Sequence, residues 1–443
     1  MPQLPWDLWL NAPALPEGLS LSHEYDAASG LLTVTLTNRG DAPVQVSDIR
    51  VTSELEIPAG DGWAWLQGRT PSSEARVCNF ASGQSVPKSQ RSATSESVTY
   101  RSEEQLAITL LAQSTPVLFV GSLAMSGHKL DIEVTLDADE SRVTSLALVF
   151  NPADLTIAPG ESANLQPILL TEGRDALNLM HAYADDVVGL AAALPAAAKA
   201  PATGPKAPFG PAIGRVETMP VAPSPVSLKS VASALHRNWM NGRWWRNNPG
   251  ALNLAEPLPL PEARFLATAI AMSGGVVDVL SANDLPADRQ EIAAALTSAP
   301  GIAALPYDLA DGPTPFAWRV ELGEGRFLVG FLNWGDTSRW IASGEFLRPG
   351  EIAFDVWNRK KLGMGDTLLR PHEGALWQVA SRGPTPRVVG DTASLTYQDL
   401  FQRQVSGRIQ VRNDLARPRI IAIESRGQVY DVELAPGEMR WFD

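Results

Sequence analysis

The sequence predicts a mainly β protein with an α/β insert, and three observations support this fold class. Short alternating segments fill the first 170 residues, helical spacing replaces them from Asp175, and short strand-like segments return from Phe316 onward. Segments of many short strands with polar turns between them are typical of antiparallel sandwiches. We therefore expect three parts, with boundaries at residues 1–172, 173–305 and 306–443.

The N-terminal part has the pattern of half-buried strands. Apolar and polar residues alternate over Leu31–Thr37, Leu106–Leu111 and Leu130–Leu136, and clusters of Gly, Asn, Asp and Pro separate these segments. Alternation places every second side chain on one face of a sheet. The pattern predicts a large antiparallel β-sandwich over residues 1–172.

The middle part changes to a helical period. Apolar residues recur at helical spacing from Leu177 to Ala191, and Pro195 ends the pattern. Residues 196–227, rich in Ala, Pro and Gly, have the composition of a linker. Further helices are expected at Leu228–Met240, Pro261–Met272 and Pro286–Leu296, with one short strand at Gly275–Leu280. This alternation predicts a small α/β fragment.

The C-terminal part again reads as strands. Seven short segments suffice for a second sandwich, and they lie at Phe316–Leu322, Arg326–Asn333, Glu351–Trp357, Gly374–Ala380, Arg408–Arg412, Arg419–Glu424 and Gln428–Leu434.

Composition excludes several classes of function. The formal net charge of −13 argues against nucleic acid and acidic membranes as partners. The lone Cys78 excludes an internal disulfide and a dithiol centre, and five scattered histidines show no zinc spacing. We therefore expect no metal and no cofactor. The N-terminal residues carry no visible secretory signal, which favours a cytoplasmic location.

One polar and aromatic segment is a candidate binding site. Trp244, Trp245, Arg246, Asn247 and Asn248 precede Pro249 at an expected strand end. Indole faces stack on sugar rings, and guanidinium and amide groups recognise neighbouring hydroxyls. The segment predicts a site for a neutral polyol, and a purely structural turn remains the alternative.

Carboxylates are the candidate catalytic groups. Glu217, Asp278 and Asp284 lie in the α/β fragment. A retaining glycosidase needs two carboxyl groups about 5–5.5 Å apart. Nothing in the spacing of these three residues forces any two together, and solvated surface positions are the alternative.

The segments around this site resemble a known family. Ala234–Leu252, Glu262–Gly275 and Leu280–Leu285 resemble the late barrel segment of glycoside hydrolase family 36 α-galactosidases. The downstream segments Gly330–Gly335, Phe354–Asn358, Leu362–Gly363 and Pro371–His372 are similar to the C-terminal β domain of that family, and Asp61–Gly68 is similar to part of its N-terminal domain. The resemblance implies an N-terminal β-supersandwich, a (β/α) barrel and a C-terminal β-sandwich.

The chain is too short for a complete barrel of this kind. A (β/α)₈ barrel takes about 250 residues, and the segment between Asp175 and Leu285 supplies fewer than half of them. We therefore expect a partial barrel remnant made of the last barrel units. Its exposed flank must be covered by residues 196–227, by the N-terminal part or by another subunit, and a homodimer through this flank is one hypothesis.

The functional motifs of the family are altered at four places. The family places its nucleophile in a Lys-x-Asp motif, and the sequence has these letters at Lys129–Asp131, inside an expected N-terminal strand. The acid/base motif Arg-x-x-x-Asp corresponds to Arg215–Met219, where Glu217 is the nearest acid. The substrate motif Asn-Asp-Pro-Asp reads Asn247–Gly250 without either carboxylate, and a family Gln-Ser-Trp turn is absent after Gly68.

The resemblance and these changes together predict the function. We expect an α-galactosidase-like protein of carbohydrate metabolism that is catalytically impaired or inactive and retains at most binding of an α-galactoside or another sugar. Asn neither ionises nor transfers a proton at neutral pH, so it replaces neither catalytic carboxylate. Two alternatives stay open. One is an active α-galactosidase or other O-glycosyl hydrolase with a rebuilt carboxylate pair, and the other is a structural or assembly protein without a small ligand.

Overall fold

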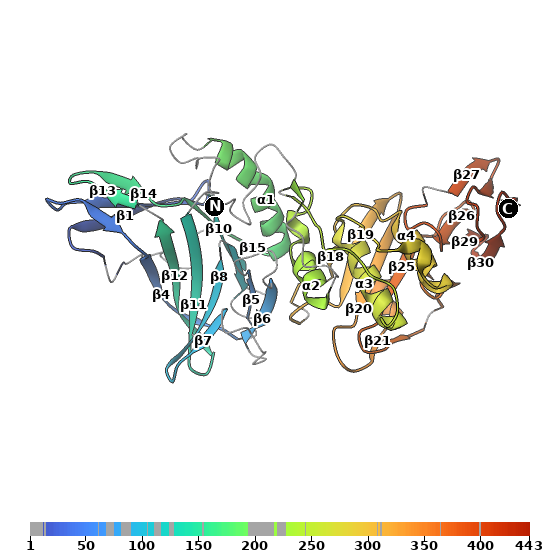
Figure 1. Ribbon diagram of the computed structural model, residues 1–443, viewed down its shortest axis with the longest axis horizontal. Coiled ribbons are helices and arrows are strands. Elements are labelled where there is room, and N and C mark those ends of the chain that lie inside the picture. The colour runs from blue at the N-terminus through green and yellow to red at the C-terminus, as the bar shows by residue number, and fades with distance from the viewer. Residues whose placement is uncertain are drawn as a thin grey trace. The chain divides into compact units, whose positions relative to one another are not determined.

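The computed structural model describes two compact units (Figure 1). They comprise residues 1–217 with 243–245, and residues 218–242 with 246–443. The described residues are 12, 15–60, 62–67, 75–80, 90–103, 105–109, 117–123, 128–152, 155–193, 217–218, 227–243, 245–307, 309–310, 312–363, 365–397 and 400–443.

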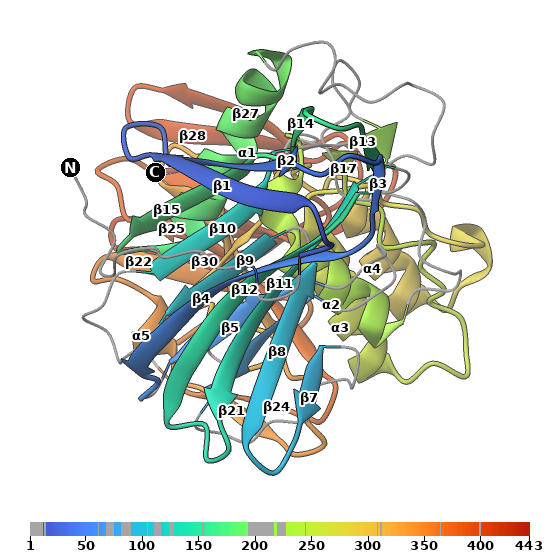
Figure 2. The same ribbon diagram turned by 90° about the vertical axis from the view of Figure 1, so that its left-hand side faces the viewer.

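The first unit is built from two antiparallel sheets. The larger sheet has eight strands: β1 (Leu19–Asp26), β2 (Leu31–Asn38), β15 (Ile168–Gly173), β10 (Val117–Ser122), β9 (Gln105–Thr109), β5 (Trp63–Leu66) and β6 (Arg76–Asn79) in spatial order, with β14 (Ser162–Asn164) paired to β2. The second sheet runs β4 (Ile49–Pro58), β12 (Arg142–Pro152), β11 (His128–Asp137), β8 (Ser97–Glu103) and β7 (Arg91–Ala93). Figure 2 shows these five strands side by side. A small ribbon joins β3 (Val44–Val46) to β13 (Leu155–Ile157).

Alternation in the sequence produces the core between these sheets. Leu32, Val34 and Leu36 of β2 are buried, while the residues between them are half-buried. Leu130 and Ile132 of β11 enter the same core from the other sheet. The predicted N-terminal sandwich is therefore confirmed.

Helix α1 (Ala176–Ala193) covers the outer face of the larger sheet. Asp175 begins it, because the Oδ1 atom of Asp175 accepts hydrogen bonds from the backbone N–H of Leu177 at 2.8 Å and of Asn178 at 3.1 Å. The ring of Tyr183 packs 4.8 Å from the ring of Phe119. Gly121 allows this contact, since a Cβ there would lie 2.5 Å from the Tyr183 ring.

The second unit is centred on a six-stranded antiparallel sheet. Its order is β18 (Leu305–Pro306), β19 (Ala317–Gly323), β20 (Arg326–Leu332), β25 (Gly374–Ser381), β22 (Glu351–Asp355) and β23 (Lys360–Lys361). Helix α3 (Leu260–Ser273) lies against β25 and β20 (Figure 1). The opposite face packs against the ribbon of β21 (Arg339–Ile341) and β24 (Thr367–Leu369) and against α5 (Ser343–Phe346).

The remaining elements of this unit precede and follow α3. They are α2 (Leu228–His236), the 3₁₀ turns η3 (Asn238–Met240) and η4 (Ala282–Asp284), and α4 (Ala287–Leu296). Two very short strands, β16 (Glu217–Thr218) and β17 (Trp245–Arg246), lie near the boundary between the units. Ser227 and Ser230 form a capping box at the start of α2. The helices expected at Leu228–Met240, Pro261–Met272 and Pro286–Leu296 are confirmed, with a break after His236.

A small sandwich ends the chain. One sheet is β26 (Arg387–Asp391), β29 (Arg419–Ser425) and β30 (Gln428–Leu434), and the other is β27 (Leu400–Val405), β28 (Arg408–Asn413) and β31 (Met439–Phe442). Both sheets contribute to the apolar core between them, which includes Val388, Ile409, Val411, Ile421 and Ile423. All seven predicted C-terminal strands are present, and the strands that the pattern missed are short ones or carry little alternation.

The C-terminal sandwich contains a buried ion pair between Arg419 and Asp391. The Nε atom of Arg419 donates to Asp391 Oδ1 at 3.1 Å, and both side chains are fully buried. Burial raises the pKa of the Asp391 carboxyl to about 6, although the Arg419 charge opposes the shift. The buried Arg419 guanidinium is therefore paired with a carboxylate that is costly to ionise.

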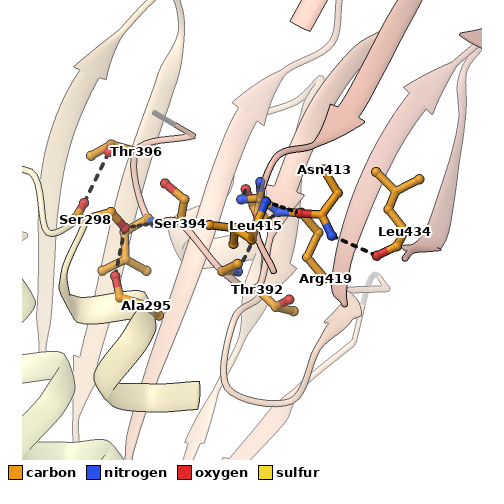
Figure 3. A network of polar contacts seen from close by, with 12 residues as sticks. Ala295, Ser298, Thr392, Ser394, Thr396, Asn413, Leu415, Arg419 and Leu434 are labelled. Carbon is orange, nitrogen blue, oxygen red and sulfur yellow. Dashed lines mark hydrogen bonds and ion pairs between the residues drawn. The ribbon is translucent and has the colours of Figure 1, made fainter. Parts of the chain in front are cut away.

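Ser298 ties the end of α4 to the loop after β26 (Figure 3). Its hydroxyl donates to Ala295 O and accepts from the backbone N–H of Leu395, both at 2.8 Å. The Thr396 hydroxyl donates to the Ser298 carbonyl at 3.2 Å. These bonds position the α/β segment against the C-terminal strands inside one unit.

Candidate functional site

The candidate site lies where two extended segments run parallel on either side of α3. The backbone N–H of Leu252 donates to Asp278 O at 2.8 Å, and Leu280 N–H donates to Leu252 O at 2.9 Å. Val276 N–H donates to Asn247 O at 2.8 Å. Because α3 connects the two parallel segments, they form one β-α-β-like crossover.

The strand expected at Gly275–Leu280 does not form, so this prediction was wrong. A single parallel bridge joins Leu252 and Val279. Asn247 is bonded to Val276, and Leu252 is bridged to Val279. The segment before α3 has more residues between these two paired positions than the segment after α3 has. A regular ladder cannot continue across unequal lengths. Among the described residues, no set of parallel strands closes into a barrel.

Three asparagine amides cap the C-terminal end of α3. Helix ends leave their last carbonyl groups without helical partners. Asn238 donates to Met272 O at 3.0 Å, Asn247 donates to Ser273 O at 3.0 Å, and Asn241 donates to Gly274 O at 3.2 Å. Side chains therefore satisfy the helix end, and one of them, Asn247, belongs to the segment predicted to recognise a sugar.

Asn247 lies at the centre of this network and is fully buried. Its Nδ2 atom also donates to Asn238 Oδ1 at 3.0 Å, and its backbone N–H donates to Asn241 Oδ1 at 2.8 Å. Both protons of the amide are thus bound within the protein. The Asn247 side chain acts as a structural cap in this conformation.

Close backbone contact explains the glycine pair after α3. Gly274 has φ +64° and ends the helix in the left-handed conformation. A Cβ on Gly275 would lie 2.0 Å from the carbonyl oxygen of Asn247. Gly275 therefore allows the two parallel segments to approach.

The other predicted binding residues have different environments. Arg246 is exposed, and its Nη2 atom lies 3.5 Å from Gly275 O. Asn248 is half-buried, and its Oδ1 atom accepts the backbone N–H of Gly250 at 3.1 Å. Trp244 and the side chain of Trp245 lie outside the described residues. Arg246 and Asn248 are thus the described members of the set that face outward or partly outward.

Gly250 has a backbone conformation that excludes most side chains. It is buried and has φ +102°. An L residue adopts this region only with strain. The resemblance places a carboxylate of the substrate motif at this position, and the local backbone disfavours one.

The candidate catalytic carboxylates are not brought together by any contact in the described chain. Asp278 and Asp284 are both exposed. Within the described residues, neither side chain takes part in a hydrogen bond or an ion pair. Glu217 belongs to β16, and its side chain lies outside the described part.

The match to the Lys-x-Asp motif at Lys129–Asp131 lies within β11, in agreement with the N-terminal strand expected there. Leu130 between them is fully buried in the sandwich core, and Asp131 forms an ion pair with Arg101. These residues stabilise the N-terminal sheet.

Two buried basic residues, Arg237 and His236, lie directly before Asn238 of the cap network, and the sequence pattern did not predict the burial of Arg237. Arg237 is fully buried, and burial lowers its pKa to about 9. His236 is also buried, and its Nε2 atom lies 2.8 Å from Pro313 O. The only signal for the asparagine network was the recurrence of Asn at positions 238, 241 and 247 before a helix that ends in Gly274.

Two general features of the described residues bear on ligands and membranes. No group of three or more His, Cys, Asp or Glu side chains is placed to hold a metal ion in the described part. No helix in that part combines the length and apolar character needed to cross a membrane.

No protein-family model matches the chain, and no curated protein matches it. Several solved structures do. The galactosidase domain of the α-galactosidase-sucrose kinase AgaSK is 7% identical over 85% of this chain and 86% of that chain, with a TM-score of 0.41. The family 36 α-galactosidase AgaA from Geobacillus stearothermophilus is 9% identical over 82% and 81%, with a TM-score of 0.42.

A third match is to a putative α-N-acetylgalactosaminidase from Bacillus halodurans C-125. It is 14% identical with a TM-score of 0.29, and the alignment covers 35% of this chain. The chain spans less than half of the length of that protein, at 43%. The family resemblance still rests on the sequence motifs.

Proposed function

We propose that the protein is an α-galactosidase-like protein of carbohydrate metabolism that lacks hydrolytic activity and retains at most sugar binding. The observation that carries the proposal is the backbone at Gly250. A buried glycine with φ +102° stands where the resemblance expects a carboxylate, so that restoring the acid would strain the chain.

The amides of the same motif support this proposal. The Asn247 amide is bound to Ser273 O and Asn238 Oδ1, and Asn248 Oδ1 accepts the Gly250 N–H. Neither group ionises at neutral pH. Retaining hydrolysis needs one carboxylate below the anomeric carbon and a second carboxyl group as acid. The substrate motif at Asn247–Gly250 contains no carboxylate, and the two motifs that would supply the catalytic pair in the family are altered in this sequence.

A retained sugar site would use Trp244, Trp245, Arg246 and Asn248. The exposed Arg246 guanidinium is a donor for sugar hydroxyls, and the indoles would supply the stacking surface. Asn247 would position the segment and would not contact the ligand. The ligand class is a galactoside or another neutral sugar.

The experiment combines turnover and binding. The purified protein at high concentration is incubated for many hours with p-nitrophenyl α-galactoside, beside the variants E217Q, D278N and D284N. We expect no nitrophenol release from any of them. Turnover that disappears in one variant would instead establish an active hydrolase with a rebuilt carboxylate pair.

Calorimetric titration with galactose, melibiose and raffinose tests the binding part. We expect millimolar binding that is lost in R246A and N248A, while W340A, which changes an exposed Trp on β21, binds as the wild type does. Titrations that stay flat for all three sugars contradict sugar binding at this segment.

A structural or assembly role is the second candidate. The observation that favours it is the asparagine network, which accounts for the amides of Asn238, Asn241 and Asn247 without a ligand. A homodimer through the flank of the α/β fragment belongs to this candidate. Light scattering on a size-exclusion column tests it, and a 47.5 kDa particle at micromolar concentration argues against the dimer.

A further inference from the structure

The C-terminal sandwich has an uncovered sheet face with an unusual distribution of side chains. Ile409 and Val411 of β28 are buried in the sandwich core, so Arg408, Gln410 and Arg412 point away from it. The register places Phe401 of β27 opposite Arg412, and Arg412 opposite Met439 of β31. Trp441 of β31 lies opposite Gln410. We call this surface the outer C-terminal face.

Two aromatic rings are held apart on this face. Phe401 and Trp441 expose 36% and 42% of their surfaces. They lie on the two edge strands and differ by two residues along the register. Strand spacing of about 4.8 Å and a rise of about 3.4 Å per residue place them roughly 12 Å apart. Each ring thus forms a separate platform.

Guanidinium groups fix the orientation of both rings. The Arg412 guanidinium lies 4.9 Å from the Phe401 ring centre, and that of Arg408 lies 5.6 Å from the Trp441 ring centre. Arg412 is in turn paired with Asp414, and Arg408 with Asp443. The polar middle strand is therefore organised before any ligand arrives.

The positive charges of this face are partly neutralised, which argues against a polyanion. Arg412 is paired with Asp414, Asp443 is shared by Arg408 and Arg426, and Arg403 adds one further positive charge. A nucleic acid or an acidic membrane needs a clear excess of positive charge. The face instead offers alternating donors and acceptors.

The arrangement also argues against a protein partner or a second copy of this chain. Stable protein interfaces have an apolar centre and a polar rim. Here the order is reversed, because Arg408, Gln410 and Arg412 form the middle strand and the apolar residues stand on the edges. A protein surface docked there would bury the charged groups at its centre.

We propose that the outer C-terminal face binds an extended, uncharged polysaccharide. Sugar rings would stack on Phe401 and Trp441, and hydroxyl groups between them would bond to Gln410 and to the arginine–aspartate pairs. A polymer fits because the two platforms lie too far apart for a single ring. The inference is independent of the function proposed for the segment at Trp244–Asn248.

The test is affinity gel electrophoresis of the full-length protein in gels that contain galactomannan, arabinogalactan or dextran. We expect at least one polymer to retard the wild type. W441A and F401A should each weaken retardation about tenfold or more, and Q410A should weaken it less. The matched control W340A, which removes an exposed Trp from another sheet, should migrate as the wild type does.

Several results would overturn the proposal. No retardation in any of the three gels would do so, as would equal retardation of the wild type and W441A, provided that both show the same thermal unfolding. A single-stranded oligonucleotide shift that W441A abolishes would establish a nucleic-acid surface instead. A dimer in light scattering that W441A dissociates would establish contact between copies.

The two sugar proposals fail separately. W441A should leave the raffinose titration unchanged, and R246A should leave retardation in the polymer gel unchanged. A variant that removes both signals would contradict the independence of the two surfaces.

Discussion

The segment Trp244–Asn248 and the outer C-terminal face have similar side chains, but their amide groups point in opposite directions, inward in the first and outward in the second. Each combines Trp, Arg and amide residues. In the first, the Asn247 amide turns inward to Ser273 O, whereas in the second Gln410 faces outward beside Trp441. Where neighbouring backbone carbonyl groups lack hydrogen-bond donors, polar side chains turn inward to supply them. Polar side chains remain available for a ligand where the backbone is already paired.

The physical cause lies in the neighbouring backbone groups. The end of α3 leaves carbonyl groups that need donors, and the nearest amides supply them. The middle strand β28 has its backbone groups paired by β27 and β31 on both sides. The outward side chains of β28 are therefore not needed as hydrogen-bond partners for the backbone of this strand.

Substitution of the buried cap should have the largest effect on stability. N247A removes two donated hydrogen bonds and leaves Ser273 O and Asn238 Oδ1 without that donor. We expect a loss of about 3 kcal/mol in the free energy of unfolding. Urea denaturation followed by circular dichroism measures it. N248A is the matched control, and equal losses in both variants would refute the inward assignment of Asn247.

Substitution of Gly250 should have the next largest effect. G250D places a side chain at φ +102° in a buried position, and we expect a loss of about 2 kcal/mol. G242D is the control, because Gly242 has φ +77° and is exposed, and a Cβ added there would meet no atom within 4 Å. The same assay compares them. A stable G250D that hydrolyses p-nitrophenyl α-galactoside would show that the backbone accepts the family carboxylate.

A pH effect should distinguish the inside of the C-terminal sandwich from its outer face. The pKa of buried Asp391 is raised to about 6, so the folded state binds a proton more readily than the unfolded chain, whose value is near 3.8. This group therefore lowers stability above about pH 6, and its contribution recovers as the pH falls toward 4.

The expected gain is on the order of 1 kcal/mol between about pH 7 and pH 5. Urea denaturation of the wild type and D391N over this range measures it, since D391N has no carboxyl group to titrate. D414N is the control, because Asp414 forms an exposed pair with Arg412. A D391N profile parallel to the wild-type profile would contradict the raised pKa.

Substitutions on the outer C-terminal face should have the smallest effect on stability. W441A removes an exposed ring, and we expect a change within about 0.5 kcal/mol in the free energy of unfolding. Thermal unfolding by differential scanning fluorimetry checks this. A large loss of stability would mean that Trp441 is needed for packing. The outer C-terminal face would then resemble the Asn247 region, where the side chains have a structural role.

Much of the fold followed from local pattern. Alternation at Leu31–Thr37 and Leu130–Leu136 predicted strands that now face one core, because a period of two fixes the buried face of a strand. The strand predicted at Gly275–Leu280 is absent, because a strand needs a partner in register and the segment around Pro249 provides a single bridge, at Leu252. Short strands such as β21 and β24 gave no periodic signal.

The candidate site was less predictable. The sequence shows that Trp244–Asn248 are neighbours, but it does not show where each side chain points. It also did not identify Asn238 and Asn241 as hydrogen-bond partners of Asn247. The carboxylates Glu217, Asp278 and Asp284 remain predictions. The spacing of acidic residues along a chain does not show which of them come close together in the folded protein, because that depends on long-range packing.

By itself, the sequence determined the β-rich classes of the two ends, the helices between them and the absence of an acidic residue from Asn247–Gly250, because local periodicity and residue identity are properties of the chain. Only the tertiary structure decided that Asn247 is a cap, since its acceptor at Ser273 lies 26 residues away. It also decided that Phe401 and Trp441 share one face, since strand order and register bring them there. Hydrogen-bond partners and strand neighbours are set by long-range packing, which local pattern does not encode.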